Sequence, residues 1–136
     1  MINQIPNHFI QIDEEGYFQR EQVRISDAES GRAWLASLHK DEQNHLLCDL
    51  GGTKAIVEPF DEPYVAVDIE KSSANWSLIM TYGHRESFNP ETLTVDEWDR
   101  FHGRTTRGLA FVLSRAAQTR FFDLLEAFDD DSITID

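Results

Sequence analysis

Alternation of apolar and polar residues between Leu46 and Tyr82 is the feature that most constrains the fold of this chain. Three short segments in this range place apolar side chains at every second position: residues 46–50, 65–69 and 76–82. A two-residue period predicts β-strands with one buried face and one more exposed face. The connections are short and contain turn-forming residues such as Gly51 and Pro63. The sequence therefore predicts neighbouring antiparallel strands.

A hairpin and a helix are predicted ahead of these strands. Residues 8–13 and 16–20 flank the charged turn Asp13-Glu14-Glu15-Gly16, and residues 23–25 extend the second strand. Ser26 and Glu29 have the spacing of a capping box, which predicts a helix that begins at Ser26. The polar residues 40–44 would end this helix, and its buried side would carry Trp34, Leu35 and Leu38.

A second capping box follows Pro90. Thr94 and Glu97 form the box, and Leu93 and Trp98 occupy the positions of a hydrophobic staple. This pattern predicts a short helix over residues 95–102, ended by Gly103.

Residues 106–128 have the spacing of a long final helix. One broad face would carry Leu109, Leu113, Ala116, Leu124 and Phe128. The alternative is a strand over residues 108–113, with Ser114 capping a shorter helix. Length and the alanines favour the single helix. The acidic residues 129–136 are expected to form a frayed tail.

These elements predict one α+β domain over residues 1–136. We expect an antiparallel sheet of five or six strands, packed against the helix near Trp34 and the C-terminal helix. At 136 residues, 40% of them hydrophobic, the chain has ample material for one core.

Several blocks of the sequence, in order, resemble a known family. They are Ile12-Asp13 with Gly16 and Phe18; Leu47-Cys48 with Gly51, Pro63 and Val65; Leu78, Tyr82, Gly83, Phe88, Pro90 and Leu93; and Leu109-Ala110-Phe111 with Leu113-Ser114. The chain resembles the family catalogued as domain of unknown function 4505. That family's glycine- and proline-rich segment is reduced here to His102-Gly103-Arg104. The resemblance implies an intracellular α+β domain and supplies no activity.

Charge and cysteine content limit the binding partners and the cellular compartment that we expect for this chain. The chain has 12 basic and 25 acidic residues, a formal net charge of −13, which disfavours binding to nucleic acids and anionic membranes. The single cysteine excludes an internal disulfide and favours a reducing compartment. Residues 1–9 show no secretory signal, and no apolar run reaches the ~20 residues of a membrane helix. We therefore expect a cytoplasmic protein.

The common catalytic motifs are missing from the sequence. Gly51-Gly52 lacks the lysine and following helix of a phosphate-binding loop, and no GxSxG is present. The five histidines are scattered, so neither a metal nor another cofactor is expected. Cys48 and His45, three apart on a strand, would point to opposite faces, which favours a buried inert thiol over a nucleophile.

Two groups of residues are candidates for function. The first is a strand end, where Tyr82, His84 and Arg85 could bind a carboxylate or phosphate and Asp68 could orient His84.

The second group lies among five arginines between residues 100 and 122, a stretch without acidic residues. On a helix, Phe111, Arg115 and Phe122 would share a face, continued by Arg104 and Arg107. Aromatic and arginine side chains together are typical of protein interfaces. Intramolecular pairing with the acidic remainder of the chain is the alternative.

The sequence therefore favours a non-enzymatic interaction or regulatory domain that contacts another protein or a second copy through its C-terminal helix. The alternative is a binder of, or modest enzyme for, a small anionic metabolite near Tyr82.

Overall fold

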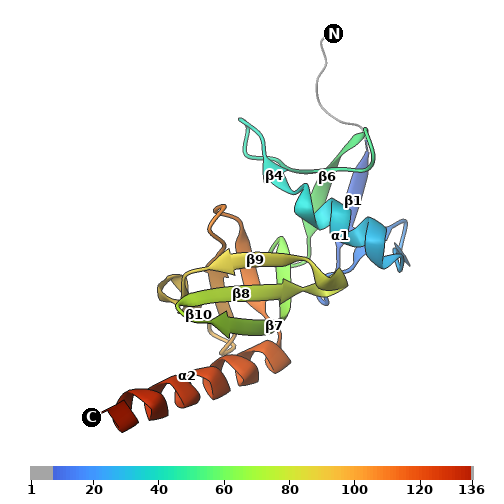
Figure 1. Ribbon diagram of the computed structural model, residues 1–136. Coiled ribbons are helices and arrows are strands. Elements are labelled where there is room, and N and C mark those ends of the chain that lie inside the picture. The colour runs from blue at the N-terminus through green and yellow to red at the C-terminus, as the bar shows by residue number, and fades with distance from the viewer. Residues whose placement is uncertain (1–7, 136) are drawn as a thin grey trace.

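Two six-stranded sheets and two helices make up the computed structural model (Figure 1). The structure describes the backbone of residues 8–135 and the side chains of residues 8–127. Residues 1–7, part of the segment for which no secretory signal is predicted, and Asp136 of the expected acidic tail lie outside this range.

The first sheet has the strand order β3-β2-β1-β6-β5-β4. Its strands are β1 (Phe9–Ile12), β2 (Phe18–Arg20), β3 (Val23–Arg24), β4 (His39–Lys40), β5 (Leu46–Asp49) and β6 (Lys54–Pro59). The predicted hairpin is confirmed, since β1 and β2 pair antiparallel. Residues 23–24 do not extend β2 but turn back to pair with it as β3. The neighbouring β1 and β6 run parallel.

The second sheet has the order β10-β11-β12-β7-β8-β9. Its strands are β7 (Tyr64–Ser72), β8 (Asn75–Met80), β9 (Arg85–Phe88), β10 (Thr94–Val95), β11 (Phe101–Arg104) and β12 (Ala110–Leu113). Short 3₁₀ turns, η1 (Thr81–Gly83) and η2 (Pro90–Thr92), flank β9. Here too one neighbouring pair, β7 and β12, is parallel.

The expectation of one antiparallel sheet was therefore wrong in two respects, although the α+β class is confirmed. There are two sheets, and each is mixed. Alternation within a strand reports which residues share a face, but it does not report the direction of the neighbouring strand. The buried residues still form one continuous cluster, which includes Ile10 and Phe18 from the first sheet and Leu78 and Phe111 from the second.

Helix α1 (Ala28–Ala36) packs between the two sheets. Its N-cap is Asp27, one residue later than predicted, because the Asp27 carboxylate accepts the Ser30 N–H. Leu35 is buried as expected, and so is Leu38 just beyond the helix. In the first half of α1, Gly31 lies so close to the Tyr82 ring that a Cβ at this position would come within 2.4 Å of the ring.

The helix predicted over residues 95–102 is absent. Residues 94–95 form β10, and β11 returns antiparallel from Phe101. Between the strands, the Asp96 carboxylate accepts the N–H groups of Trp98 and Arg100, and Asp99 has a positive φ of 60°. The apparent capping box is thus part of an aspartate-stabilised turn, which uses the same residue types as a helix start.

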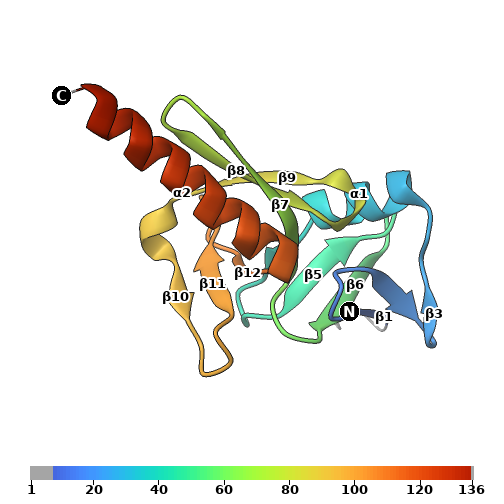
Figure 2. The same cartoon turned by 90° about the horizontal axis from the view of Figure 1, so that it is seen from below.

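The long final helix was also wrong in its first part, and the alternative is confirmed. Ala110–Leu113 is strand β12, and helix α2 (Arg115–Ile135) follows. Ser114 caps α2, since its hydroxyl accepts the Ala117 N–H. Helix α2 packs on β7 and β12 and projects past the sheet toward the C-terminus (Figure 2), so it includes the residues expected to fray. Neither helix in the described residues carries an apolar stretch sufficient to span a membrane.

Candidate functional site

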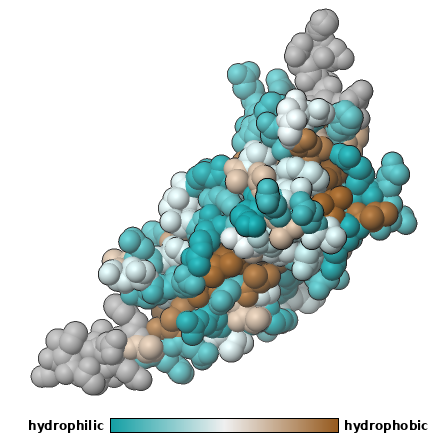
Figure 3. All heavy atoms as spheres, turned by 45° about the vertical axis from the view of Figure 1, so that its right-hand side comes forward, coloured by the Kyte–Doolittle hydropathy of each residue, from teal (hydrophilic) through white to brown (hydrophobic). Residues whose placement is uncertain are grey.

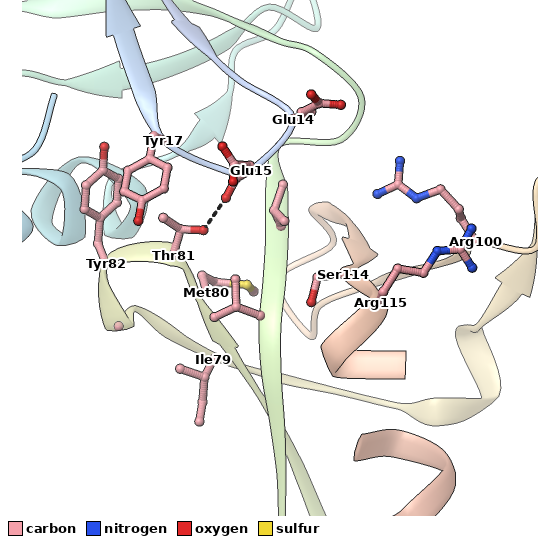
Figure 4. A pocket seen from close by; sticks show the side chains of 13 residues that line it. Glu14, Glu15, Tyr17, Ile79, Met80, Thr81, Tyr82, Arg100, Ser114 and Arg115 are labelled. Carbon is pink, nitrogen blue, oxygen red and sulfur yellow. Dashed lines mark hydrogen bonds between the residues drawn. The ribbon is translucent and has the colours of Figure 1, made fainter. Parts of the chain in front are cut away.

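A cleft of about 590 Å³ opens where the β1–β2 turn meets the second sheet and the start of α2 (Figure 4). We call it the junction cleft. Its walls come from four separate parts of the chain: the β1–β2 turn, strands β7 and β8 with η1, the residue before β11, and the α2 N-terminus. Its lining residues are Glu14, Glu15, Tyr17, Val65, Val67, Ile79, Met80, Thr81, Tyr82, Gly83, Arg100, Ser114 and Arg115.

The floor of the junction cleft is apolar. Strand β7 contributes Val65 and Val67, and strand β8 contributes Ile79 and Met80. The pairing of β7 with β8 shifts register between residues 66 and 68, so Val67 is an extra residue on the β7 side. This bulge lets the early part of β7 present two valines to the cleft while Ile69, beyond the bulge, faces the core.

The β1–β2 turn is fixed tightly against this floor. Gly16 has a φ of +90°, and a Cβ there would come within 2.5 Å of the Thr81 hydroxyl and 2.9 Å of Val65. The Thr81 hydroxyl donates to the Glu15 carbonyl at 2.6 Å. Glycine is therefore required at position 16 both by its conformation and by the close approach of the two sheets.

Asp13 stabilises the same turn. Its carboxylate accepts the N–H groups of Glu15 and Tyr17 and pairs with Arg24 at 2.8 Å. Burial alone would raise the pKa of Asp13, but the hydrogen bonds from Tyr17, Arg24 and Glu15 outweigh it, and the pKa is lowered. The turn that forms one wall of the cleft is thus held by an ionised carboxylate.

Basic and acidic side chains occupy different parts of the rim. Figure 4 shows Arg100 and Arg115 together at one side, the two tyrosines at the opposite side, and Glu14 and Glu15 on the turn between them. Arg100 reaches Asp61, and Arg115 reaches the Trp98 carbonyl, only at 3.4 Å. Such long contacts on partly exposed guanidinium groups leave both free to rotate toward an anion.

Tyr82 contributes to the cleft mainly as a structural residue. Its hydroxyl accepts the Phe18 N–H at 2.9 Å and donates to the Ile25 carbonyl at 2.7 Å. Burial raises the pKa of Tyr82 despite the hydrogen bond from Phe18. With its φ of 69°, this residue turns the chain at the end of β8 and joins η1 to the first sheet.

The other residues of the predicted strand-end site do not converge with Tyr82. His84 lies 2.6 Å from Glu86 rather than next to Asp68. Arg85 forms an exposed pair with Glu70, and the Asp68 carboxylate accepts the N–H of the next residue. Successive residues after η1 alternate between the two faces of β9, which separates His84 from Arg85.

Glu86, which the sequence analysis did not select, is buried at the centre of a polar network that reaches the surface at Arg107. Its carboxylate contacts His84, Arg107 and the Tyr64 hydroxyl. Arg107 donates to the Tyr64 hydroxyl, which donates to the Leu35 carbonyl of α1. Burial and the nearby Glu86 charge raise the pKa of Tyr64. The network therefore joins the second sheet to α1.

The predicted interaction face does not form on α2. Phe111 lies in β12 with 0% of its surface exposed and packs edge-on against Phe88. Arg107 belongs to the network around Glu86, and Arg104 on β11 donates to the Gly108 carbonyl. Only Arg115 and Phe122 lie on the helix, because residues 106–113 form a loop and strand instead.

A different group of apolar side chains is exposed beside α2, and we call it the aromatic patch. Val95 and Phe101 are cross-strand partners and so share one face. The Phe101 ring packs edge-on against Phe122, 5.5 Å away. Phe122 is 47% exposed, and Trp98, whose carbonyl accepts a hydrogen bond from Arg115 at the start of α2, is 67% exposed. Figure 3 shows that apolar surface on the face in view gathers in bands, one of which runs toward the C-terminal end.

The prediction for Cys48 is confirmed. The thiol is fully buried, and burial raises the pKa of Cys48 to about 12. His45 instead contacts Asp41 at the surface. A thiol with so high a pKa carries no appreciable thiolate at neutral pH and is not a nucleophile.

Comparison with known proteins shows the fold and no more. No family model matches the chain, and no curated protein matches it either. A DUF1285 family protein from Shewanella baltica OS155 has a similar structure, with a TM-score of 0.70, 18% sequence identity, and coverage of 84% of this chain and 90% of that one.

A DUF1285 family protein from Silicibacter pomeroyi DSS-3 gives a TM-score of 0.67 and 19% identity, covering 90% of this chain and 73% of that one. The resemblance to an uncharacterised domain is therefore supported, whereas the particular family 4505 is not. Because the sequence identities are only 18% and 19%, the similarity shows that this chain has the fold of the DUF1285 structures and nothing further.

Proposed function

We propose that this protein binds a small amphipathic molecule in the junction cleft, with an apolar body on the floor and an anionic group at Arg100 and Arg115. The observation that carries the proposal is the combination, in the cleft of about 590 Å³, of an apolar floor with two weakly engaged guanidinium groups on one side. Pockets for small ligands are usually mostly apolar, with a few polar groups that orient the ligand.

The position of the two arginines favours a monocarboxylate over a phosphate-rich ligand. Among the residues that the structure describes, Arg100 and Arg115 are the only cations that line the cleft, and Glu14 and Glu15 line it as well. Glu15 is paired with Arg24 at 2.7 Å, while Glu14 is exposed on the turn. A ligand with several negative charges would be repelled by Glu14, whereas one carboxylate can bind at the arginine side. An apolar amino acid could also place its ammonium group near Glu14.

A thermal-shift screen tests this proposal. The panel contains medium-chain monocarboxylates, arylpropionates, apolar amino acids and short dicarboxylates without an apolar body. A ligand at a hundred times its dissociation constant should add about 2.7 kcal/mol to the free energy of unfolding. We expect hits among the first three classes and none among the dicarboxylates.

Substitution of the arginines shows whether a hit binds in the junction cleft. The Arg115→Gln and Arg100→Gln variants should each lose most of the shift, since each removes a partner of the carboxylate. Arg85→Gln is the matched control, because Arg85 is exposed and lies outside the cleft. A hit that Arg85→Gln weakens and the cleft variants leave unchanged would contradict the proposal.

A second candidate function is a protein contact, favoured by the exposure of Trp98 and Phe122 on the aromatic patch. We infer that this patch would bind a second copy of the chain, as two aromatic side chains of this kind are typical interface anchors. Light scattering after size exclusion should show self-association that Trp98→Ser with Phe122→Ser abolishes. A parent chain that is monomeric at all concentrations would exclude this candidate.

A further inference from the structure

His102 on β11 lies between carboxylates from two different loops. Its Nδ1 is 2.8 Å from Glu62 Oε2, and its Nε2 is 2.7 Å from Asp96 Oδ2. Asp61 is adjacent to Glu62 in the β6–β7 connection. One donor atom from each of Asp61, Glu62 and His102 lies within 4.8 Å of the others. The β6–β7 connection thus brings two carboxylates to one imidazole.

These three donors are suited to a divalent transition metal. Zinc binds imidazole nitrogen and carboxylate oxygen at about 2.0–2.2 Å, and manganese accepts the same donor types. A metal ion between the three side chains would need Glu62 to move slightly away from Nδ1, with which it now shares a hydrogen bond. Pro63 restricts the backbone of Glu62 to extended conformations, so this adjustment falls on the side chain.

Asp96 occupies the position of a residue that orients a metal-binding histidine. Its Oδ2 contacts His102 Nε2, and its Oδ1 accepts the N–H groups of Trp98 at 2.8 Å and Arg100 at 3.0 Å. The carboxylate is therefore fixed by the β10–β11 turn. Histidines that bind metal through one nitrogen usually donate the other N–H to such a carboxylate.

The surroundings offer room and charge for an ion. A cavity of about 230 Å³ borders Glu62 and His102, so water can complete the coordination shell. Three carboxylates surround one imidazole. Of the nearby cations, Arg100 contacts Asp61 only at 3.4 Å, and Arg104 lines the same cavity but donates to the Gly108 carbonyl. A divalent ion would balance more of this negative charge than the single proton that His102 can hold between Glu62 and Asp96.

We propose that Asp61, Glu62 and His102 bind one divalent transition-metal ion, zinc or manganese, and that Asp96 orients His102 from the opposite side. The remaining coordination positions face the cavity beside Glu62 and are open to water or another small ligand. None of these residues lines the junction cleft, although Asp61 contacts Arg100 at the rim of that cleft, and the metal proposal does not depend on the proposed function.

Isothermal titration of zinc chloride and manganese chloride into the chelator-treated full chain tests the proposal. We expect saturable binding of one equivalent, with zinc tighter than manganese. Asp96→Asn should weaken zinc binding by about 10- to 100-fold, as for other residues that orient a metal-binding histidine. Asp61→Asn and His102→Gln should weaken it further, because each removes a direct ligand.

The matched control is His45→Gln, which removes another surface histidine that contacts a carboxylate, Asp41. Its affinity for zinc should equal that of the parent. Asp61 is exposed, so Asp61→Asn keeps the test valid even if the His102 variant unfolds. Absence of saturable binding at millimolar metal, or equal affinity in the parent and Asp61→Asn, would overturn the proposal. His102 would then only link Glu62 to Asp96 through hydrogen bonds.

Discussion

Arg107 Nη2 lies 2.6 Å from the Tyr64 hydroxyl, and through it a loop of the second sheet is tied to α1. Arg107 also contacts Glu86, whose side chain is almost fully buried. A residue predicted to continue the interaction face of a helix is thus part of the polar network around Glu86. Buried carboxylates are costly unless paired, so the contact with Arg107 stabilises the buried Glu86 and with it the attachment of α1 to the second sheet.

Removal of the Tyr64 hydroxyl should destabilise the fold. In Tyr64→Phe, the Leu35 carbonyl loses its donor and Arg107 loses an acceptor, which costs about 1–3 kcal/mol. Chemical denaturation measures the loss. The control is Tyr17→Phe, because none of the hydrogen bonds described for residues 8–127 involves the Tyr17 hydroxyl. Equal stability of the two variants would show that the Tyr64 hydroxyl does not stabilise the contact between the second sheet and α1.

Substitution of Phe111 should affect folding rather than an interface. Phe111 is fully buried, so Phe111→Ala should cost about 3–5 kcal/mol. Phe122→Ala removes a half-exposed ring and should cost much less. The two midpoints in thermal denaturation provide the comparison. Similar small effects from both substitutions would fit the helix over residues 106–128 and contradict strand β12.

Gly31→Ala should destabilise the domain even though alanine favours helices. Alanine gains about 0.5–1 kcal/mol over glycine within a helix. Its Cβ, however, would lie 2.4 Å from the Tyr82 ring, and overpacking of this kind costs about 1–3 kcal/mol. Arg32→Ala, at the next and exposed position, is the control. An increase in melting temperature for Gly31→Ala would show that α1 does not pack on η1 as described.

Asp13 should make stability depend on pH in the acid range. Its folded pKa is lowered from 3.8, so the ionised carboxylate stabilises the fold above about pH 4, and this contribution is lost as pH falls through the folded pKa. Asp13→Asn should therefore be less stable than the parent near neutral pH, and the difference should disappear in strong acid. Denaturant midpoints measured from acid to neutral pH give the stability difference between the parent and Asp13→Asn. The variant Asp123→Asn, at an exposed position, is the reference. A difference that is constant with pH would contradict the described pairing.

Local patterns in the sequence predicted much of the fold because they depend on neighbouring residues. The β1–β2 hairpin, the strands around Cys48 and Leu78, and α1 all follow from alternation, turns and capping. The division into two sheets does not, since the parallel pairs β1–β6 and β7–β12 join segments far apart in the chain. The helix predicted over residues 95–102 does not form, because the same residue types stabilise both helix N-caps and turns such as the one around Asp96.

The candidate sites were predicted less well, because each is assembled through space. Arg100 and Arg115 belong to the arginine-rich stretch, yet both reach the cleft lined by Val67 and Met80 only through tertiary packing, which for Arg115 is that of α2 on β7. Likewise, His102 was one of five scattered histidines, and no spacing rule links it to Asp61, forty-one residues earlier in the chain. Of the residues predicted for function, Tyr82 and Arg115 line the junction cleft, although the sequence placed them in two different sites.

Methionine methyl NMR tests the central claim, that the junction cleft binds an amphipathic carboxylate. The chain has two methionines, Met1 and Met80, so the methyl signal of Met80 on the cleft floor is readily assigned. Titration of octanoate into the methyl-labelled protein should shift this signal saturably, and Arg115→Gln should weaken the apparent affinity by about tenfold or more. An unchanged Met80 signal at saturating octanoate and at saturating levels of every hit from the screen would contradict the account.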